Sequence, residues 1–163
     1  MYYFTSDTHF HHFNIISFEN RTWCLKDPSV LKNENFKATN EDMHNMNEIL
    51  INNINKIVKE NDTLYHLGDF AWSNNKGYLK GYLDIIRPKI KCKNIVLIPG
   101  NHDDKCIYEY FSLVDKDLIV NYEREQMVLH HYCKYTWYKN PYGTWHLYGH
   151  SHTNIEAEMD RIF

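Results

Sequence analysis

Five short motifs place aspartate, histidine or asparagine at or near the end of a strand-like segment. They are Asp7-Thr8-His9, Gly68-Asp69, Gly100-Asn101-His102-Asp103, His130-His131 and Gly149-His150-Ser151-His152. Carboxylate, imidazole and amide groups are ligands for divalent metals such as Mn, Fe and Zn. Residues two apart in an extended segment point to the same side, so each D-x-H or H-x-H pair can reach one metal ion. The pattern therefore indicates metal chemistry.

Each of these motifs is weak when it is taken alone. An aspartate at a strand end, such as Asp7, more often caps a turn, and Gly68-Asp69 is a common turn dipeptide. Gly100-Asn101 also suits a plain turn. The glycine that precedes three of the polar residues allows the backbone to turn tightly beside a crowded site. Only the five motifs together indicate a functional site.

The apolar segments between the motifs alternate between strand and helix patterns. We expect strands over residues 2–7, 62–67, 94–98 and 144–149, and two strands joined by a tight turn over 117–132. We expect helices over residues 39–62, 77–86 and 104–113, and a loop with short helical pieces up to about residue 38. This alternation indicates an α/β domain, in which functional residues gather where strands hand over to loops.

Length and composition limit the class of protein. A chain of 163 residues with 43% hydrophobic residues suits a single globular domain spanning residues 1–163. The net charge of -3 argues against a broad polyanion-binding surface. The four cysteines are scattered without a C-x-x-C pair, and we find no signal-peptide or transmembrane pattern. We therefore expect reduced thiols and a cytoplasmic protein.

The five motifs follow one another as D-x-H, G-D, G-N-H-D, H and G-H-x-H across residues 7–152. This order resembles the calcineurin-like metallophosphoesterase superfamily. The stretches FTSDTHFHHFNII and YHLGDFAW look especially like its small bacterial and phage members. The resemblance implies a four-layer αββα sandwich of two mixed β-sheets flanked by helices. It also implies phosphoester hydrolysis that uses two divalent metal ions, from among Mn, Fe, Zn and Ni.

The resemblance also implies which side chains bind the metals. One metal would bind Asp7, His9, Asp69 and His152, and the second would bind Asp69, Asn101, His131 and His150. Asp69 would thus bridge the two. In the fourth motif only one of His130 and His131 can enter the site, because neighbours in a strand face opposite ways. His131 precedes a tyrosine, as it does in small relatives, so we favour His131.

The third motif would supply the catalytic groups. Asn101 would bind metal, and His102 would lie beside the phosphate, where it would stabilise transition-state charge or protonate the leaving oxygen. Asp103 would then hold His102 in orientation.

Three further residues are weaker candidates for contact with the substrate: His12, Asn14 and Arg21. Small relatives often place a histidine and an asparagine after the first motif, although loop polar groups that satisfy each other explain the pair equally well. Arg21 is the best cation of the irregular segment to meet a phosphate oxygen, and a structural salt bridge is at least as good an explanation.

The expected partner is a phosphoester substrate, for example a nucleotide or a nucleic acid, with no membrane partner and no indication of the oligomeric state. The complete G-N-H-D motif with His102 favours a phosphodiesterase acting on a nucleotide-like, cyclic-nucleotide or nucleic-acid substrate. Two alternatives stay open. One is a phosphomonoesterase for a small phosphorylated substrate, because both reactions use the same core. The other is a non-catalytic binding scaffold with the same fold. The texts GDFAWSN and GNHDD differ from the corresponding motifs of protein Ser/Thr phosphatases, which disfavours that branch.

Overall fold

Four short apolar segments pair side by side into one parallel sheet. The computed structural model describes residues 1–152, and the order in this sheet is β1 (Tyr2–Thr5), β2 (Thr63–His66), β3 (Asn94–Leu97) and β4 (Leu113–Val114). The central strands are buried on both faces, which explains the near-continuous apolar run around β3. A sheet of this kind brings the carboxyl ends of its strands to one edge.

The second sheet contains three strands from the C-terminal half of the chain. A tight turn joins β5 (Leu118–Tyr122) to β6 (Glu125–Leu129) as an antiparallel pair, and β7 (Trp145–Leu147) lies parallel to β6. Val120 and Leu129 of this sheet pack against Tyr65, Val96 and Ile98 of the first sheet. The two sheets therefore form a sandwich with an apolar interior.

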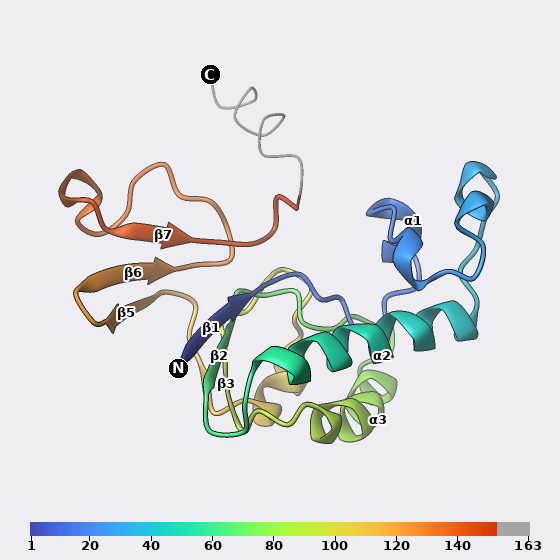
Figure 1. Ribbon diagram of the computed structural model, residues 1–163, viewed down its shortest axis with the longest axis horizontal. Helices are drawn as coiled ribbons and strands as arrows, with labels where there is room; N and C mark the ends of the chain where they lie inside the picture. The colour runs from blue at the N-terminus through green and yellow to red at the C-terminus, as the bar shows by residue number, and fades with distance from the viewer. Residues whose placement is uncertain (153–163) are drawn as a thin grey trace.

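The two long helices cover the other face of the first sheet, as Figure 1 shows. They are α2 (Asn40–Ile57) and α3 (Lys76–Ile86). Thr39 and Asp42 form a reciprocal capping box that fixes the start of α2. Ile51 of α2 and Leu83 of α3 belong to the same buried cluster as Ile95 of β3. No helix within residues 1–152 is both long and apolar enough to cross a membrane.

The remaining helical pieces are short. They are α1 (Ile15–Phe18) and the 3-10 turns η1 (Thr22–Cys24), η2 (Pro28–Lys32), η3 (Arg87–Lys89), η4 (Lys105–Tyr110) and η5 (Asn140–Tyr142). The prediction of a helix over residues 104–113 is wrong. The segment forms η4 and then enters the first sheet as β4, where pairing with β3 ends the helical path.

The expected α/β sandwich of two sheets is confirmed, and two details differ from the four-layer expectation. Helical crossovers connect β1, β2 and β3, so the first sheet is parallel rather than mixed. Within residues 1–152 the long helices cover only the first sheet, and loop residues 136–138 flank the second. The last eleven residues of the expected single domain, 153–163, lie outside the described residues.

Candidate metal centre

All five sequence motifs lie just beyond the carboxyl end of a strand. Asp7 follows β1, Asp69 follows β2 and Asn101 follows β3, while His131 and His150 follow the parallel strands β6 and β7. The edges of the two sheets therefore meet at one place, and the residues of the motifs gather there from positions up to 145 residues apart in the chain.

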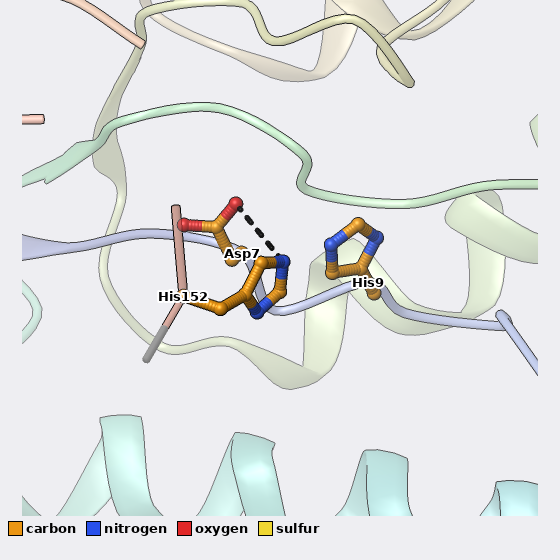
Figure 2. Close-up of side chains that lie close together, drawn as sticks. All are labelled: Asp7, His9 and His152. Atoms are coloured by element: carbon orange, nitrogen blue, oxygen red, sulfur yellow. Dashed lines mark ion pairs between the residues drawn. The ribbon is translucent and has the colours of Figure 1, made fainter. Parts of the chain in front are cut away.

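The first cluster contains Asp7, His9 and His152. One ligand atom from each lies within 4.8 Å of the other two. Figure 2 shows the carboxylate of Asp7 facing the imidazole of His152, with His9 beside them, and Asp7 Oδ1 is 3.8 Å from His152 Nε2. The backbone N–H of His150 also donates to Asp7 Oδ1, at 3.1 Å. This contact ties the end of β7 to the end of β1.

The second cluster contains Asp69, His131 and His150, again with ligand atoms within 4.8 Å of one another. His131 is buried, and its Nδ1 bonds to the carbonyl oxygen of Leu67 at 2.7 Å, so its Nε2 turns toward the site. Asn101 Oδ1 lies 3.2 Å from that Nε2. The neighbouring His130 bonds within its own loop, to the backbone of Tyr132. The structure thus places His131, and not His130, beside Asp69.

Asp69, a member of the second cluster, also faces the first cluster. Its Oδ2 is 3.7 Å from His9 Nε2 and 3.6 Å from His131 Nε2. Its Oδ1 accepts the backbone N–H of His102 at 2.9 Å, which fixes the orientation of the carboxylate. One carboxylate oxygen therefore faces a histidine of each cluster, as a bridging ligand would.

The backbone around these side chains is strained in a consistent way. Positive φ angles occur at five of the aspartate and histidine positions of the motifs: Asp7, His9, Asp69, His150 and His152. Non-glycine residues rarely adopt this conformation, and they do so mainly where the surrounding structure holds them for a function. Two glycines permit the close approach: an added Cβ at Gly149 would lie 2.5 Å from Asp7 Oδ2, and one at Gly100 would lie 2.7 Å from the backbone N of Asp69.

His9 provides the test of whether these residues suit a metal. The side chain is almost completely buried, and both of its ring nitrogens lack a hydrogen-bond partner. Burial, with smaller contributions from His12 and Arg21, lowers the pKa of His9 to about 2, so the ring is neutral and keeps a free lone pair. An unsatisfied buried nitrogen is costly unless another group, such as a metal ion, binds it. The site therefore fits a bound metal.

The sequence model described as calcineurin-like phosphoesterase matches residues 2–156. The chain belongs to this family. The chain is also 29% identical over 153 residues to the uncharacterized protein MJ1445 of Methanocaldococcus jannaschii, a match that covers 93% of this chain and 69% of that protein. A solved structure of similar fold is the protein of unknown function AQ665 from Aquifex aeolicus. It has a TM-score of 0.57 and 22% identity, with 100% of this chain and 99% of that chain covered.

Asp103 differs from the expectation for this calcineurin-like site. Its Oδ2 accepts the backbone N–H groups of Asp69 and Gly100 at 2.8 and 2.9 Å, and its Oδ1 accepts that of Phe70 at 2.8 Å. Every hydrogen bond of this carboxylate thus goes to a backbone amide in the described part of the chain, and none goes to His102. Burial raises its pKa to about 6, an effect that the amide bonds partly offset. Asp103 therefore holds the loops of Asp69 and Asn101 rather than the imidazole of His102.

Arg21 also differs from its expected role as a phosphate contact. The guanidinium is buried and donates to the carbonyl oxygens of Asp7 and Thr8, each at 2.8 Å. Burial lowers its pKa, and the nearby Glu19 carboxylate acts in the opposite direction. Within residues 1–152 the side chain does not form the alternative salt bridge either, because its hydrogen-bond acceptors there are two carbonyl oxygens and the sulfur of Met46. Its cation instead supports the strained turn that presents Asp7 and His9.

One cavity of about 390 Å³ is lined by His102, His12 and Asn14, and also by Trp72 and Phe18. The ring of His102 is half-buried, with its centroid 5.4 Å from that of His9. His12 lies against Trp72, with centroids 4.5 Å apart, and burial lowers its pKa to about 4. Asn14 is exposed at the start of α1. The structure thus brings two of the three candidate substrate residues to a cavity beside the candidate metal ligands.

Glu19 is a site residue that the sequence reasoning missed. Its Oε2 lies 3.3 Å from His152 Nδ1, the ring nitrogen away from Asp7. A carboxylate in this position orients a metal-binding histidine. No periodicity or motif marks Glu19, since it lies in an irregular segment and meets His152 only through the fold.

Proposed function

We propose that the protein is a dinuclear-metal-dependent phosphodiesterase that hydrolyses a nucleotide-like, cyclic-nucleotide or nucleic-acid phosphoester. The calcineurin-like family generally consists of metal-dependent phosphoesterases. The observation that carries the proposal for this chain is the position of Asp69. Its Oδ2 faces His9 of one cluster and His131 of the other at nearly equal distances. A carboxylate so placed suits two cations that share one ligand.

In this proposal the two clusters are the first coordination spheres. Asp7, His9, Asp69 and His152 would hold one cation, and Asp69, Asn101, His131 and His150 would hold the other. Mixed nitrogen and oxygen donors suit Mn, Fe, Zn or Ni. Two bound divalent cations supply charge for the phosphoryl oxygens and lower the pKa of an attacking water. The chain itself orients His131 through Leu67 and His152 through Glu19.

His102 is the proposed catalytic residue beyond the metal ligands. Its backbone N–H binds Asp69, while its ring faces the cavity that contains His12 and Trp72. The imidazole therefore lies next to the metal site but does not belong to either cluster. In this position it can stabilise charge on the phosphate or give a proton to the leaving oxygen. Asn101 contributes through the second metal, and Asp103 contributes by fixing the backbone of both loops.

The lining of the cavity supports a nucleotide-like substrate. Trp72 and Phe18 lie within the same cavity as His102, and Phe18 is largely exposed. Such aromatic side chains can contact a planar group of the substrate, such as a nucleobase. His12 and Asn14 would line this side of the substrate. A phosphomonoesterase would use the same core, and a non-catalytic binding scaffold would have the same fold. Turnover measurements must therefore separate both alternatives from the proposed phosphodiesterase.

The test compares bis-p-nitrophenyl phosphate with p-nitrophenyl phosphate, using metal-stripped protein to which Mn, Fe, Zn, Ni or Mg is restored. We expect metal-dependent cleavage that is faster for the diester, and a loss of about a hundredfold or more in His102→Ala. The matched control is His44→Ala, because His44 is an exposed histidine of α2. Faster monoester cleavage would favour the monoesterase, and bound metal without any turnover would favour the scaffold.

A further inference from the structure

A second cavity borders the metal ligands on a different side from His102. It has a volume of about 540 Å³, and Asn101 and His131 form part of its wall. Three lysines also line it: Lys76, Lys105 and Lys116. We call it the lysine cavity, and we call the 390 Å³ cavity that contains His12, Phe18, Trp72 and His102 the aromatic cavity. Ligands of the second metal cluster thus border both cavities.

The lysine cavity concentrates positive charge in a chain whose net charge is -3. Its lysines come from three places: the start of α3, the start of η4 and the loop between β4 and β5. Lys76 pairs with Asp104 at 2.6 Å, whereas Lys105 and Lys116 form no ion pair within residues 1–152. The other carboxylate in the wall, Asp103, is buried and directed at backbone amides. Two cations are therefore available to a ligand in this concave site.

The position of His102 assigns a direction to the substrate. The centroid of its ring is 5.9 Å from that of His12 and 6.2 Å from that of Trp72, so the ring faces the aromatic cavity. If His102 protonates the leaving oxygen, the leaving group departs toward the aromatic cavity. An in-line displacement needs the attacking and leaving oxygens on opposite sides of phosphorus, which directs the rest of the substrate elsewhere. The lysine cavity is the neighbouring space that can receive it.

We propose that the lysine cavity binds a second phosphate group of the substrate, carried on the part that stays bonded to phosphorus after cleavage. This inference rests on the proposed phosphodiesterase function and narrows its substrate class. An oligonucleotide, or a nucleotide with a further phosphate, has such a group, and an isolated diester has none. The second phosphate takes no part in the bond changes. The oxygen of water bonds to phosphorus as the bond to the leaving oxygen breaks. The leaving oxygen takes a proton from His102, and the proton that the water releases restores the imidazole.

A matched pair of substrates tests the inference: the p-nitrophenyl ester of thymidine 5′-phosphate with and without a phosphate on O3′. In the metal-loaded wild type we expect kcat/KM to be about fivefold to tenfold higher with the added phosphate, since each lysine contributes a modest ion pair. The advantage should shrink as salt rises. In the double variant Lys105→Gln/Lys116→Gln the ratio of the two kcat/KM values should fall to near one. Because the readout is a ratio, a general change in activity cancels.

The control is the double variant Lys32→Gln/Lys56→Gln, which removes two exposed lysines of η2 and α2 that line neither cavity. It should keep the ratio of the wild type. A ratio near one in the wild type, or an equal fall in both double variants, would overturn the inference. A binding readout does not depend on turnover: thymidine 3′,5′-bisphosphate should bind about fivefold more tightly than thymidine 5′-phosphate to the wild type. Equal affinities would overturn the lysine cavity assignment, whereas absent cleavage with unequal affinities would contradict only the proposed function.

Discussion

Asp103 fixes the backbone of Asp69, because its Oδ2 accepts the Asp69 N–H at 2.8 Å. The same oxygen accepts from Gly100, and Oδ1 accepts from Phe70. One buried carboxylate therefore satisfies three backbone amides from two loops that follow neighbouring strands. Since Asp69 Oδ2 faces a histidine of each candidate ligand cluster, this contact helps to set the position of the carboxylate between them.

The first prediction concerns Asp103→Asn. An amide presents one oxygen and one NH2 group, so it cannot accept hydrogen bonds from all three backbone donors. At least one backbone N–H would face the NH2 group of the new side chain. We expect Mn²⁺ affinity to fall by about tenfold to a hundredfold, as for other groups that orient metal ligands. Isothermal titration calorimetry measures the change. Asp104→Asn is the control, because Asp104 is the adjacent carboxylate and pairs with Lys76 instead. Equal losses in the two variants would refute this role of Asp103.

The second prediction concerns Arg21→Lys. A lysine keeps the charge but cannot reproduce the fork that binds the carbonyls of Asp7 and Thr8. We expect the free energy of unfolding to fall by about 1–3 kcal/mol, the cost of a buried acceptor without its donor. Metal affinity should fall as well, because Asp7 and His9 lie in this turn. Urea denaturation and calorimetry check both effects. Arg124→Lys, at an exposed turn residue, should change neither.

The third prediction uses two glycines with opposite surroundings. Gly149→Ala places a methyl group 2.5 Å from Asp7 Oδ2 and 3.1 Å from the carbonyl oxygen of Leu67, so we expect weaker metal binding. Gly81→Ala lies in α3, and apart from its chain neighbours and the adjoining backbone of the helix no atom lies within 4 Å of the new methyl group. It should stabilise the protein by about 0.5–1 kcal/mol through helix propensity. Thermal unfolding measures the stability of both variants, and titration with Mn²⁺ measures their metal affinity. Unchanged metal affinity in Gly149→Ala would show that Asp7 is not held as described.

The fourth prediction concerns pH and His66. This side chain is completely buried, and burial, helped by His131, lowers its pKa to about 3 from 6.5. Below pH 6.5 the unfolded chain takes up a proton that the folded chain does not, so stability is lost as pH falls from 6.5 toward 3. For His66 alone we expect a loss of about 1.4 kcal/mol between about pH 7.5 and about pH 5.5.

Urea denaturation of metal-free protein at the two pH values measures this loss. His66→Gln keeps a group that can bond to Thr8 but does not titrate. Its stability should therefore depend less on pH, by about the same 1.4 kcal/mol. An identical pH dependence in the variant and the wild type would show that His66 does not stay neutral in the folded protein.

Most of the secondary structure follows from the sequence, because the apolar periodicity of α2 and the β-branched run of β3 are strong local signals. The segment after Asp104 differs from the predicted helix for a tertiary reason. Its last residues pair with β3, and local pattern cannot reveal that pairing. The same limit applies to the outer layer, where the expected helices do not cover the second sheet within residues 1–152.

The site was predictable where residue type determines the chemistry. Two clusters form because the strand ends converge, and they contain Asp7, His9 and His152, and Asp69, His131 and His150. The resemblance carried by the order of the motifs already implied these two groups. The supporting contacts were not predictable. Asp103 and Arg21 bind backbone groups, and a sequence shows side-chain types but not which amide or carbonyl lies near them.

The most direct test of the central claim is the turnover of bis-p-nitrophenyl phosphate as Mn²⁺ is added back to metal-stripped protein. Because Asp69 faces both clusters of candidate ligands, turnover should rise until about two ions are bound per chain. The variant Asp69→Asn should lose this metal-dependent turnover. Full turnover in protein without metal, or an unchanged maximal turnover rate in Asp69→Asn, would contradict the account.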